Sequence, residues 1–112
     1  KKRLFLQFKP MKRRNKMDVI KKDGIFYLSG EFDIFHAGNV ESKIMEDYDK
    51  KSDLILDFSG VTFMDSTGLG ILISMLKELE EDGNTILVKN ATKRIKKVFE
   101  ITELDKVFGI ND

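Results

Sequence analysis

A serine and a threonine lie between an aspartate and a glycine, where a short connection after a predicted strand at 54–58 leads into a predicted helix. The four residues are Asp65-Ser66-Thr67-Gly68. A hydroxyl group at a helix start lies where backbone N–H groups lack intrahelical partners and where the helix dipole is positive. A phosphate on Ser66 would therefore be accommodated locally. Serine, threonine and aspartate are also the usual N-cap residues, so spacing alone favours a plain structural cap.

The remaining polar residues offer little for catalysis or metal binding. The chain has one histidine, His36, and no cysteine, which leaves no Ser–His pair, no disulfide and no cysteine metal site. We place His36 in solvent near a helix start. Gly68 and Gly70 lack the third glycine of a dinucleotide-binding loop. We therefore predict a non-enzyme without a cofactor or a metal, which is itself a substrate of other enzymes.

Strands that alternate with helices must position these residues. We predict strands over 17–22, 25–29, 54–58 and 85–88 and a last short one at Val107-Phe108, and helices over about 35–48, about 66–81 and after Thr92. Asp23-Gly24 is predicted to form a hairpin turn, and Gly30-Glu31-Phe32-Asp33 to leave the sheet. Right-handed crossovers give an α/β domain, with helices packed on a small mixed sheet of four to five strands.

The helix that begins at Ser66 has a predicted buried stripe. The stripe comprises Leu69, Leu72, Ile73, Leu76 and Leu79. Ile71 and Met75 lie off the stripe, either as exposed contacts for another protein or partly buried under a loop. Gly68 and Gly70 lower the helix propensity, so we expect them to permit close approach to the sheet or to a partner.

The charge of the chain is unevenly distributed. Residues 1–16 carry eight basic residues and no acid, which leaves twelve basic against nineteen acidic residues over 17–112, a balance of −7. An acidic body argues against direct DNA binding by the domain. The basic arm has three interpretations: a tether or the end of a preceding domain, an added edge strand at residues 4–8, or a contact with anionic lipid or nucleic acid. The lysine at position 1 suggests either a trimmed chain or a domain excised from a longer protein.

Three segments together resemble the STAS domain of bacterial anti-sigma factor antagonists. They are 24–33, which ends in Gly-Glu-Phe-Asp; 61–70, which contains Asp-Ser-Thr-Gly-Leu-Gly; and 86–104, a strand–helix unit. The resemblance runs from about Met17 to Ile110 and implies a STAS domain over 17–112. Two positions depart from the family: His36 replaces a serine or threonine, and Glu103 replaces a glycine suited to a left-handed helix end.

The resemblance implies a function as an anti-sigma factor antagonist. Such a protein binds an anti-sigma factor with a histidine-kinase-like ATPase fold and so releases a sigma factor for transcription. Phosphorylation of Ser66 by that partner would end the binding, with Thr67 as the second-choice acceptor, and a serine phosphatase would reverse it. We expect a cytoplasmic phosphoprotein that works by partner switching. The expected partner-binding residues are Asp33, Asp65, Ser66, Thr67, Gly68 and Ile71.

Two other functions stay open at this point. The domain could be a STAS scaffold or sensor module within a larger signalling or transport protein. A small-ligand or nucleotide-binding module is the second alternative, because the fold offers a shallow site near helix starts. No apolar run is long enough to span a membrane, and the sequence leaves open whether the domain forms a homodimer.

Overall fold

A computed structural model describes residues 17–110, which form one four-stranded sheet and three helices. The elements, in chain order, are β1 (Met17–Lys22), β2 (Ile25–Phe32), α3 (Ala37–Asp47), β3 (Leu54–Met64), α4 (Ser66–Glu80), β4 (Ile86–Lys89) and α5 (Lys93–Ile101). The sheet order is β1-β2-β3-β4. β1 and β2 are antiparallel, whereas β2, β3 and β4 run parallel. The predicted α/β fold with a small mixed sheet is confirmed.

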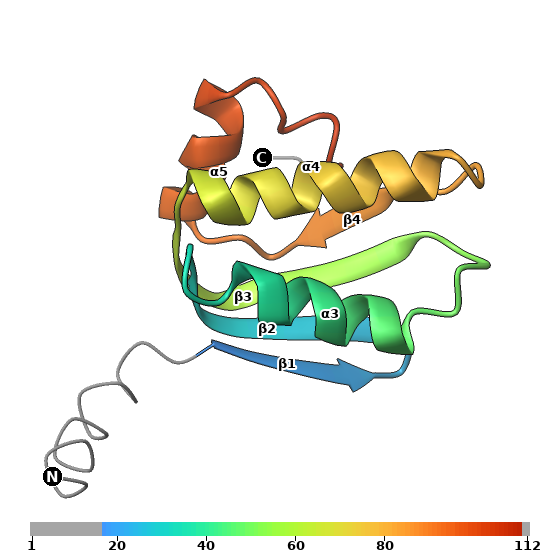
Figure 1. Cartoon of the computed structure of the whole chain (residues 1–112). Coiled ribbons are helices and arrows are strands. Elements are labelled where there is room, and N and C mark those ends of the chain that lie inside the picture. Colours follow the sequence, from blue (N-terminus) through green and yellow to red (C-terminus); the bar gives the residue numbers. More distant parts are fainter. Residues whose placement is uncertain (1–16, 111–112) are drawn as a thin grey trace, which may run out of the picture.

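Helices α3 and α4 contact each other and cover the sheet as one layer (Figure 1). Each helix connects two parallel strands that are neighbours in the sheet, and both connections step across the sheet in the same direction. Right-handed crossovers that step in the same direction place their helices on the same face. As a consequence, α3 and α4 begin at the same edge of the sheet, beyond the carboxyl ends of β2 and β3 (Figure 1).

A continuous series of aromatic contacts joins the sheet to the last helix. The ring centroids of Phe32 and Phe58 are 6.3 Å apart, those of Phe58 and Phe99 are 6.3 Å apart, and those of Phe99 and Phe108 are 5.5 Å apart. All four rings are essentially fully buried. Aromatic pairs at such distances add about 0.5–1.5 kcal/mol each beyond the effect of burial. This aromatic cluster anchors α5 and the C-terminal turn on β3.

Local signals in the sequence were read correctly at two positions. Asp23 and Gly24 have φ angles of 53° and 81°, the positive pair that a two-residue hairpin requires. Thr92 caps α5, because its Oγ1 accepts a hydrogen bond from the backbone N–H of Ile95 at 3.3 Å. Both features depend on residues that are close in sequence.

The predicted ends of several elements were wrong. β2 continues to Phe32, so residues 30–32 belong to the sheet instead of leaving it. β3 continues to Met64, with no connection after Phe58, because it stays paired with β2 through two register shifts. Helix α3 begins at Ala37. The two strand errors arose where long-range strand pairing overrides local preference, whereas α3 begins late because residues 34–36 form a turn held by Asp33.

The predicted strand at Val107-Phe108 was also wrong. These residues lie in a turn, although the carbonyl oxygen of Phe108 still accepts a hydrogen bond from the N–H of Val88 at 2.9 Å. Within residues 17–110, no helix combines the length and apolar character that a membrane span requires. The basic arm, including the proposed edge strand at residues 4–8, lies outside the described residues.

Candidate functional site

Asp65 joins the start of α4 to the loop that precedes α3. One carboxylate oxygen, Oδ1, accepts a hydrogen bond from the N–H of Gly68 at 2.9 Å and so caps the helix. The other, Oδ2, accepts from the N–H of Ile34 at 3.0 Å, across 31 residues of sequence. The backbone N–H of Asp65 donates to the carbonyl oxygen of Phe32 at 3.3 Å. The structural cap is therefore Asp65, and Ser66 does not serve as the cap.

Ser66 is the first residue of α4, and its side chain is exposed. Thr67 follows it and is partly buried. Among residues 17–110, the backbone N–H groups of Ser66 and Thr67 have no hydrogen-bond acceptor. A phosphate on the Ser66 hydroxyl would lie near these donors and near the positive end of the helix dipole.

Gly68 lies so close to β2 that no side chain fits there. A Cβ atom built at this position would be 2.3 Å from the carbonyl oxygen of Phe32. The close approach to the sheet that we predicted for Gly68 is thus confirmed. Gly70 differs: a Cβ atom there would meet nothing within 4 Å, and the residue is exposed. Of the two alternatives given for Gly70, approach to the sheet is wrong, and approach to a partner stays a prediction.

Asp33 shapes the loop before α3. Its Oδ1 accepts a hydrogen bond from the N–H of Phe35 at 3.0 Å and lies 2.7 Å from Nδ1 of His36. Its carbonyl oxygen accepts from the N–H groups of His36 and Ala37. Asp33 is only 7% exposed, so the structure gives it a role in holding the loop. His36 is partly buried against Asp33, which corrects its predicted place in solvent.

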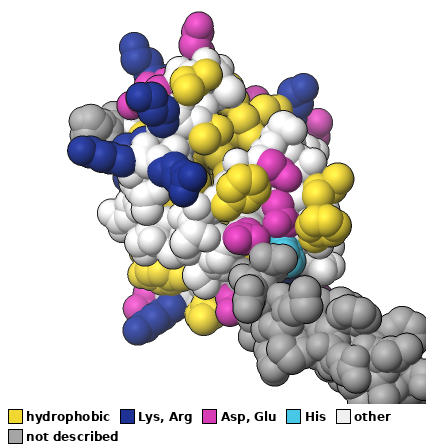
Figure 2. Space-filling model, turned by 90° about the vertical axis from the view of Figure 1, so that its left-hand side faces the viewer, with side chains coloured by type: hydrophobic (Ala, Val, Ile, Leu, Met, Phe, Trp, Pro, Cys, Tyr) yellow, Lys and Arg dark blue, Asp and Glu magenta, His cyan; other side chains and the backbone are white. Residues whose placement is uncertain are grey.

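Three large apolar side chains surround this junction and point into solvent. Ile34 is 64% exposed, Phe35 is 80% exposed and Phe63 is 45% exposed. Figure 2 shows hydrophobic side chains on both sides of a group of acidic side chains, with the histidine beside them. Ile34, Phe35, Phe63, Asp65 and Ser66 are termed the junction face below. Because larger exposed apolar patches are typical of interaction surfaces, we take the junction face as the candidate site.

Sequence reasoning missed the apolar part of the junction face. The signal for Ile34 and Phe35 was present, since two large apolar residues follow Asp33 directly in a predicted loop. Phe63 had no such signal. A register shift in β3, between the pairs Gly30–Val61 and Glu31–Phe63, leaves Thr62 and Phe63 both exposed and so breaks the alternation of a regular strand.

The two apolar residues that lie off the α4 stripe differ in burial. Ile71 is partly buried, whereas Met75 is 0% exposed. Met75 therefore belongs to the core, because α4 packs against both β3 and α3. Ile73, predicted within the buried stripe, is only partly buried. Of the two off-stripe residues, Ile71 therefore has side-chain surface that a partner could contact, and Met75 has none.

The acidic groups of the junction are not neutralised by neighbouring basic side chains. Within residues 17–110, the one acid–base side-chain contact within 4.0 Å is that between Asp33 and His36, at 2.7 Å. Asp65 and the partly buried Glu31 have no lysine or arginine within salt-bridge distance in this part of the chain. In Figure 2 the described basic side chains gather away from the acidic group. The junction therefore presents uncompensated negative charge beside apolar surface.

A second buried acid has a structural role. Asp57 is 7% exposed and accepts three hydrogen bonds, from the N–H and the hydroxyl of Ser59 and from the side-chain amide of Asn90. Burial by itself raises the pKa of Asp57, but the hydrogen bonds to its carboxylate outweigh that effect and hold the pKa below its ordinary value. This acid ties β3 to the loop after β4.

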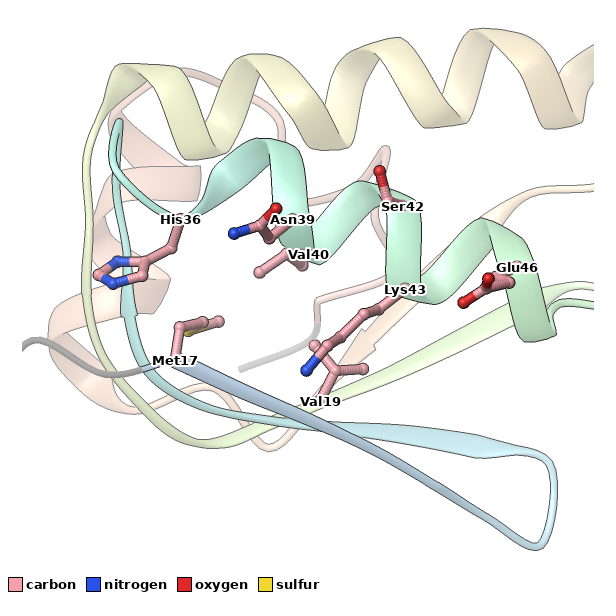
Figure 3. A pocket seen from close by; sticks show the side chains of 8 residues that line it. All are labelled: Met17, Val19, His36, Asn39, Val40, Ser42, Lys43 and Glu46. Atoms are coloured by element: carbon pink, nitrogen blue, oxygen red, sulfur yellow. The ribbon is translucent and has the colours of Figure 1, made fainter. Parts of the chain in front are cut away.

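A groove of about 210 Å³ runs between β1 and α3 (Figure 3). Its lining residues are Met17, Val19, His36, Asn39, Val40, Ser42, Lys43 and Glu46. Met17 and His36 lie together at one end, so the start of β1 is adjacent to the loop held by Asp33 (Figure 3). The described residues hold no group of three or more histidine, aspartate or glutamate side chains placed to bind a metal ion.

Comparisons with known proteins agree on one family. The family model described as the STAS domain matches residues 15–112. The anti-sigma-B factor antagonist of Bacillus subtilis (strain 168) is 29% identical over 84 residues, which are 75% of this chain and 77% of the relative. The crystal structure of an anti-sigma factor antagonist from Mycobacterium paratuberculosis is 29% identical, with a TM-score of 0.61 over 85% of this chain and 83% of that one. Bacillus SpoIIAA in its phosphorylated form shares the fold, with 24% identity and a TM-score of 0.58 over 87% of this chain and 92% of that one.

Proposed function

Because the chain belongs to the STAS domain family, we propose that it is an anti-sigma factor antagonist that acts in the cytoplasm. The junction face binds an anti-sigma factor, which releases a sigma factor, and phosphorylation of Ser66 ends that binding. The observation that carries the proposal is the geometry of the junction: Ser66 is exposed at the first position of α4, while Asp65 does the capping. The functions named for the relatives are consistent with it.

The apolar part of the junction face supports the binding step. Phe35 and Ile34 are largely exposed although they adjoin the buried residues Phe32 and Asp33. Aromatic side chains that become buried in a partner's pocket commonly dominate the energy of an interface. We therefore assign Phe35 as an anchor for the partner, with Phe63 and the partly buried Ile71 beside it.

Charge supports the switching step. A phosphoserine adds about 1.5 to 2 negative charges at neutral pH. On Ser66 this charge would join the uncompensated carboxylates of Asp65 and Glu31, at a surface that the partner must desolvate. Inside the domain, the positive end of α4 and the N–H groups of Ser66 and Thr67 accommodate the phosphate. The fold is thus retained while the surface changes.

The proposal assigns the chemistry to other proteins. A partner with a histidine-kinase-like ATPase fold transfers the γ-phosphoryl group of ATP to the Ser66 hydroxyl, with release of ADP and a proton. A serine phosphatase hydrolyses the phosphoserine and restores the binding form. Thr67, which is partly buried, is the second-choice acceptor.

A phosphorylation assay tests the acceptor. Candidate anti-sigma factor kinases from the same genome are incubated with labelled ATP and with the wild type, Ser66→Ala or Ser74→Ala. Ser74 is a matched control, because it is an exposed serine on the same helix. Labelling should disappear in Ser66→Ala and persist in Ser74→Ala. If Ser66→Ala is labelled like the wild type, Ser66 is not the acceptor.

A binding assay tests the surface. We expect Ser66→Asp to bind the anti-sigma factor at least tenfold more weakly than Ser66→Ala. We expect Phe35→Ala to lose at least tenfold in affinity, about 1.4 kcal/mol. Ile101→Ala is the control, since Ile101 is 72% exposed and belongs to α5 instead of the junction face. Equal affinities for Phe35→Ala and Ile101→Ala would exclude Phe35 as an anchor.

A further inference from the structure

The exposed apolar side chains of the junction face have a candidate occupant within the chain itself. We propose that residues 1–16 fold back on the junction face and compete there with the partner. The role as a competitor rests on the function proposed above, whereas the contact itself can be tested without any partner.

The place where the arm joins the domain supports this occupant. Met17 pairs with Gly30 in an antiparallel ladder, so the chain before Met17 leaves β1 in the direction in which β2 runs toward Phe32. Met17 also lines the same groove as His36 (Figure 3). The arm is therefore attached at the edge of the sheet where α3 and α4 begin (Figure 1).

Charge and apolar character are complementary between the arm and the face. The arm has eight basic residues and no acid, and residues 4–8 include four large apolar side chains. The junction face has exposed Ile34, Phe35 and Phe63 beside carboxylates that lack a basic partner among the described residues. An arm that carries both kinds of group can cover both parts of the face.

The distances are within reach of a short chain. Neighbouring strands lie about 4.8 Å apart, so β3 is about 10 Å from β1 across the sheet. Five extended residues span at most about 17 Å and nine about 30 Å. The arm is therefore long enough for Lys12-Arg13-Arg14 to contact the carboxylates at the junction and for the apolar residues 4–8 to contact Phe35 and Phe63.

Two consequences follow for the switch. An arm that occupies the face nine-tenths of the time lowers the apparent affinity for the partner about tenfold. A phosphate on Ser66 adds negative charge to the site of the arm and so strengthens the docked form. Phosphorylation of Ser66 would then both weaken the binding of the partner and favour the binding of the arm, its competitor.

A spin-label experiment on the whole chain tests the contact. The chain has no cysteine, so Lys9→Cys provides one attachment point for a nitroxide label, and the amide signals of the isotopically labelled protein report on its position. We expect at least twofold signal loss at Ile34, Phe35 and Ser66. Gly24 and Asn84, at the opposite end of the sheet, should keep their intensity. High salt should weaken the effect.

Two variants of equal charge separate a specific contact from a general one. The variant K12Q/R13Q/R14Q removes three charges from the arm and should abolish the signal loss at Phe35. The control K93Q/R94Q/K97Q removes three charges from the exposed side of α5 and should leave the signal loss unchanged. The arm variant should also bind the anti-sigma factor about tenfold more tightly than the control.

Three results would overturn the inference. The first is an absence of signal loss at the junction face, and the second is equal loss at both ends of the sheet. The third concerns a mixture of two kinds of chain, in which one kind carries the nitroxide and the other carries the isotope label. Full signal loss in that mixture would show that the contact forms between two copies of the chain. A failure to bind any anti-sigma factor, with the signal loss intact, would instead reject the proposed function and leave the contact standing.

Discussion

Replacement of Gly68 by alanine should destabilise the domain, although alanine is the better helix former. A Cβ atom at this position would lie 2.3 Å from the carbonyl oxygen of Phe32, whereas ordinary contacts begin at 3.4 Å. The shortfall of about 1.1 Å must be met by the backbone of β2 or α4, since no flexible side chain can give way. Overpacking of this kind typically costs about 1–3 kcal/mol.

The same displacement reaches the functional junction. The carbonyl oxygen of Phe32 also accepts the hydrogen bond from the N–H of Asp65 at 3.3 Å, and a typical hydrogen bond contributes about 0.5–1.5 kcal/mol. Alanine has a higher helix propensity than glycine, and this gain offsets at most about 1 kcal/mol of the loss from overpacking. We therefore expect Gly68→Ala to lower the free energy of unfolding by about 1–3 kcal/mol.

Gly70→Ala is the matched control in the same helix. A Cβ atom there meets nothing within 4 Å, so only the helix propensity changes and the variant should gain about 0.5–1 kcal/mol. Equilibrium unfolding in urea, followed by circular dichroism, measures both values. The reasoning would be refuted if Gly68→Ala were as stable as the wild type, or if the two variants shifted in the same direction by similar amounts.

Three further predictions concern other residues of the fold. Asp65→Ala removes the cap of α4 and should lower the free energy of unfolding by about 1–2 kcal/mol, whereas Asp65→Asn should lose less; equal losses would exclude capping as the cause. The pKa of Asp57 is lower in the folded state than its ordinary value, so its contribution is present above that value and is lost as the pH falls through the folded pKa. At neutral pH, Asp57→Asn should therefore lower the free energy of unfolding by about 1–3 kcal/mol. When unfolding is measured at decreasing pH, Asp57→Asn should lose less stability than the control Asp18→Asn, which changes an exposed acid. Parallel curves of stability against pH for the two variants would contradict this. Glu103 has a φ of 60°, a left-handed conformation that glycine adopts at lower cost. Glu103→Gly should therefore raise the free energy of unfolding by up to about 1 kcal/mol, seen as a higher midpoint of urea unfolding. An unchanged midpoint would show that this backbone is unstrained.

Much of the fold was predictable from short segments. The hairpin at Asp23-Gly24, the cap at Thr92 and the helix start at Ser66 are each set by residues within a few positions of one another. Such local preferences do not depend on how the rest of the chain packs, so they can be read in the sequence.

The burial of α4 required the packed domain. Helical spacing identifies which residues share a face, but the width of the buried face depends on how many neighbours surround the helix. Because α4 contacts both α3 and β3, Met75 is fully buried although it lies off the predicted stripe. Ile71 and Ile73 are only partly buried, and no spacing rule distinguishes them from Met75.

The sequence by itself determined that a helix begins at Asp65-Ser66-Thr67-Gly68, because the residue types that cap a helix act locally. Only the tertiary structure decided what surrounds Ser66. The bond from Ile34 to Asp65 spans 31 residues of sequence, and the register of β3 against β2 exposes Phe63. Both depend on strand pairing between distant segments, which local preferences do not specify. The binding surface therefore exists only once β2 and β3 lie side by side.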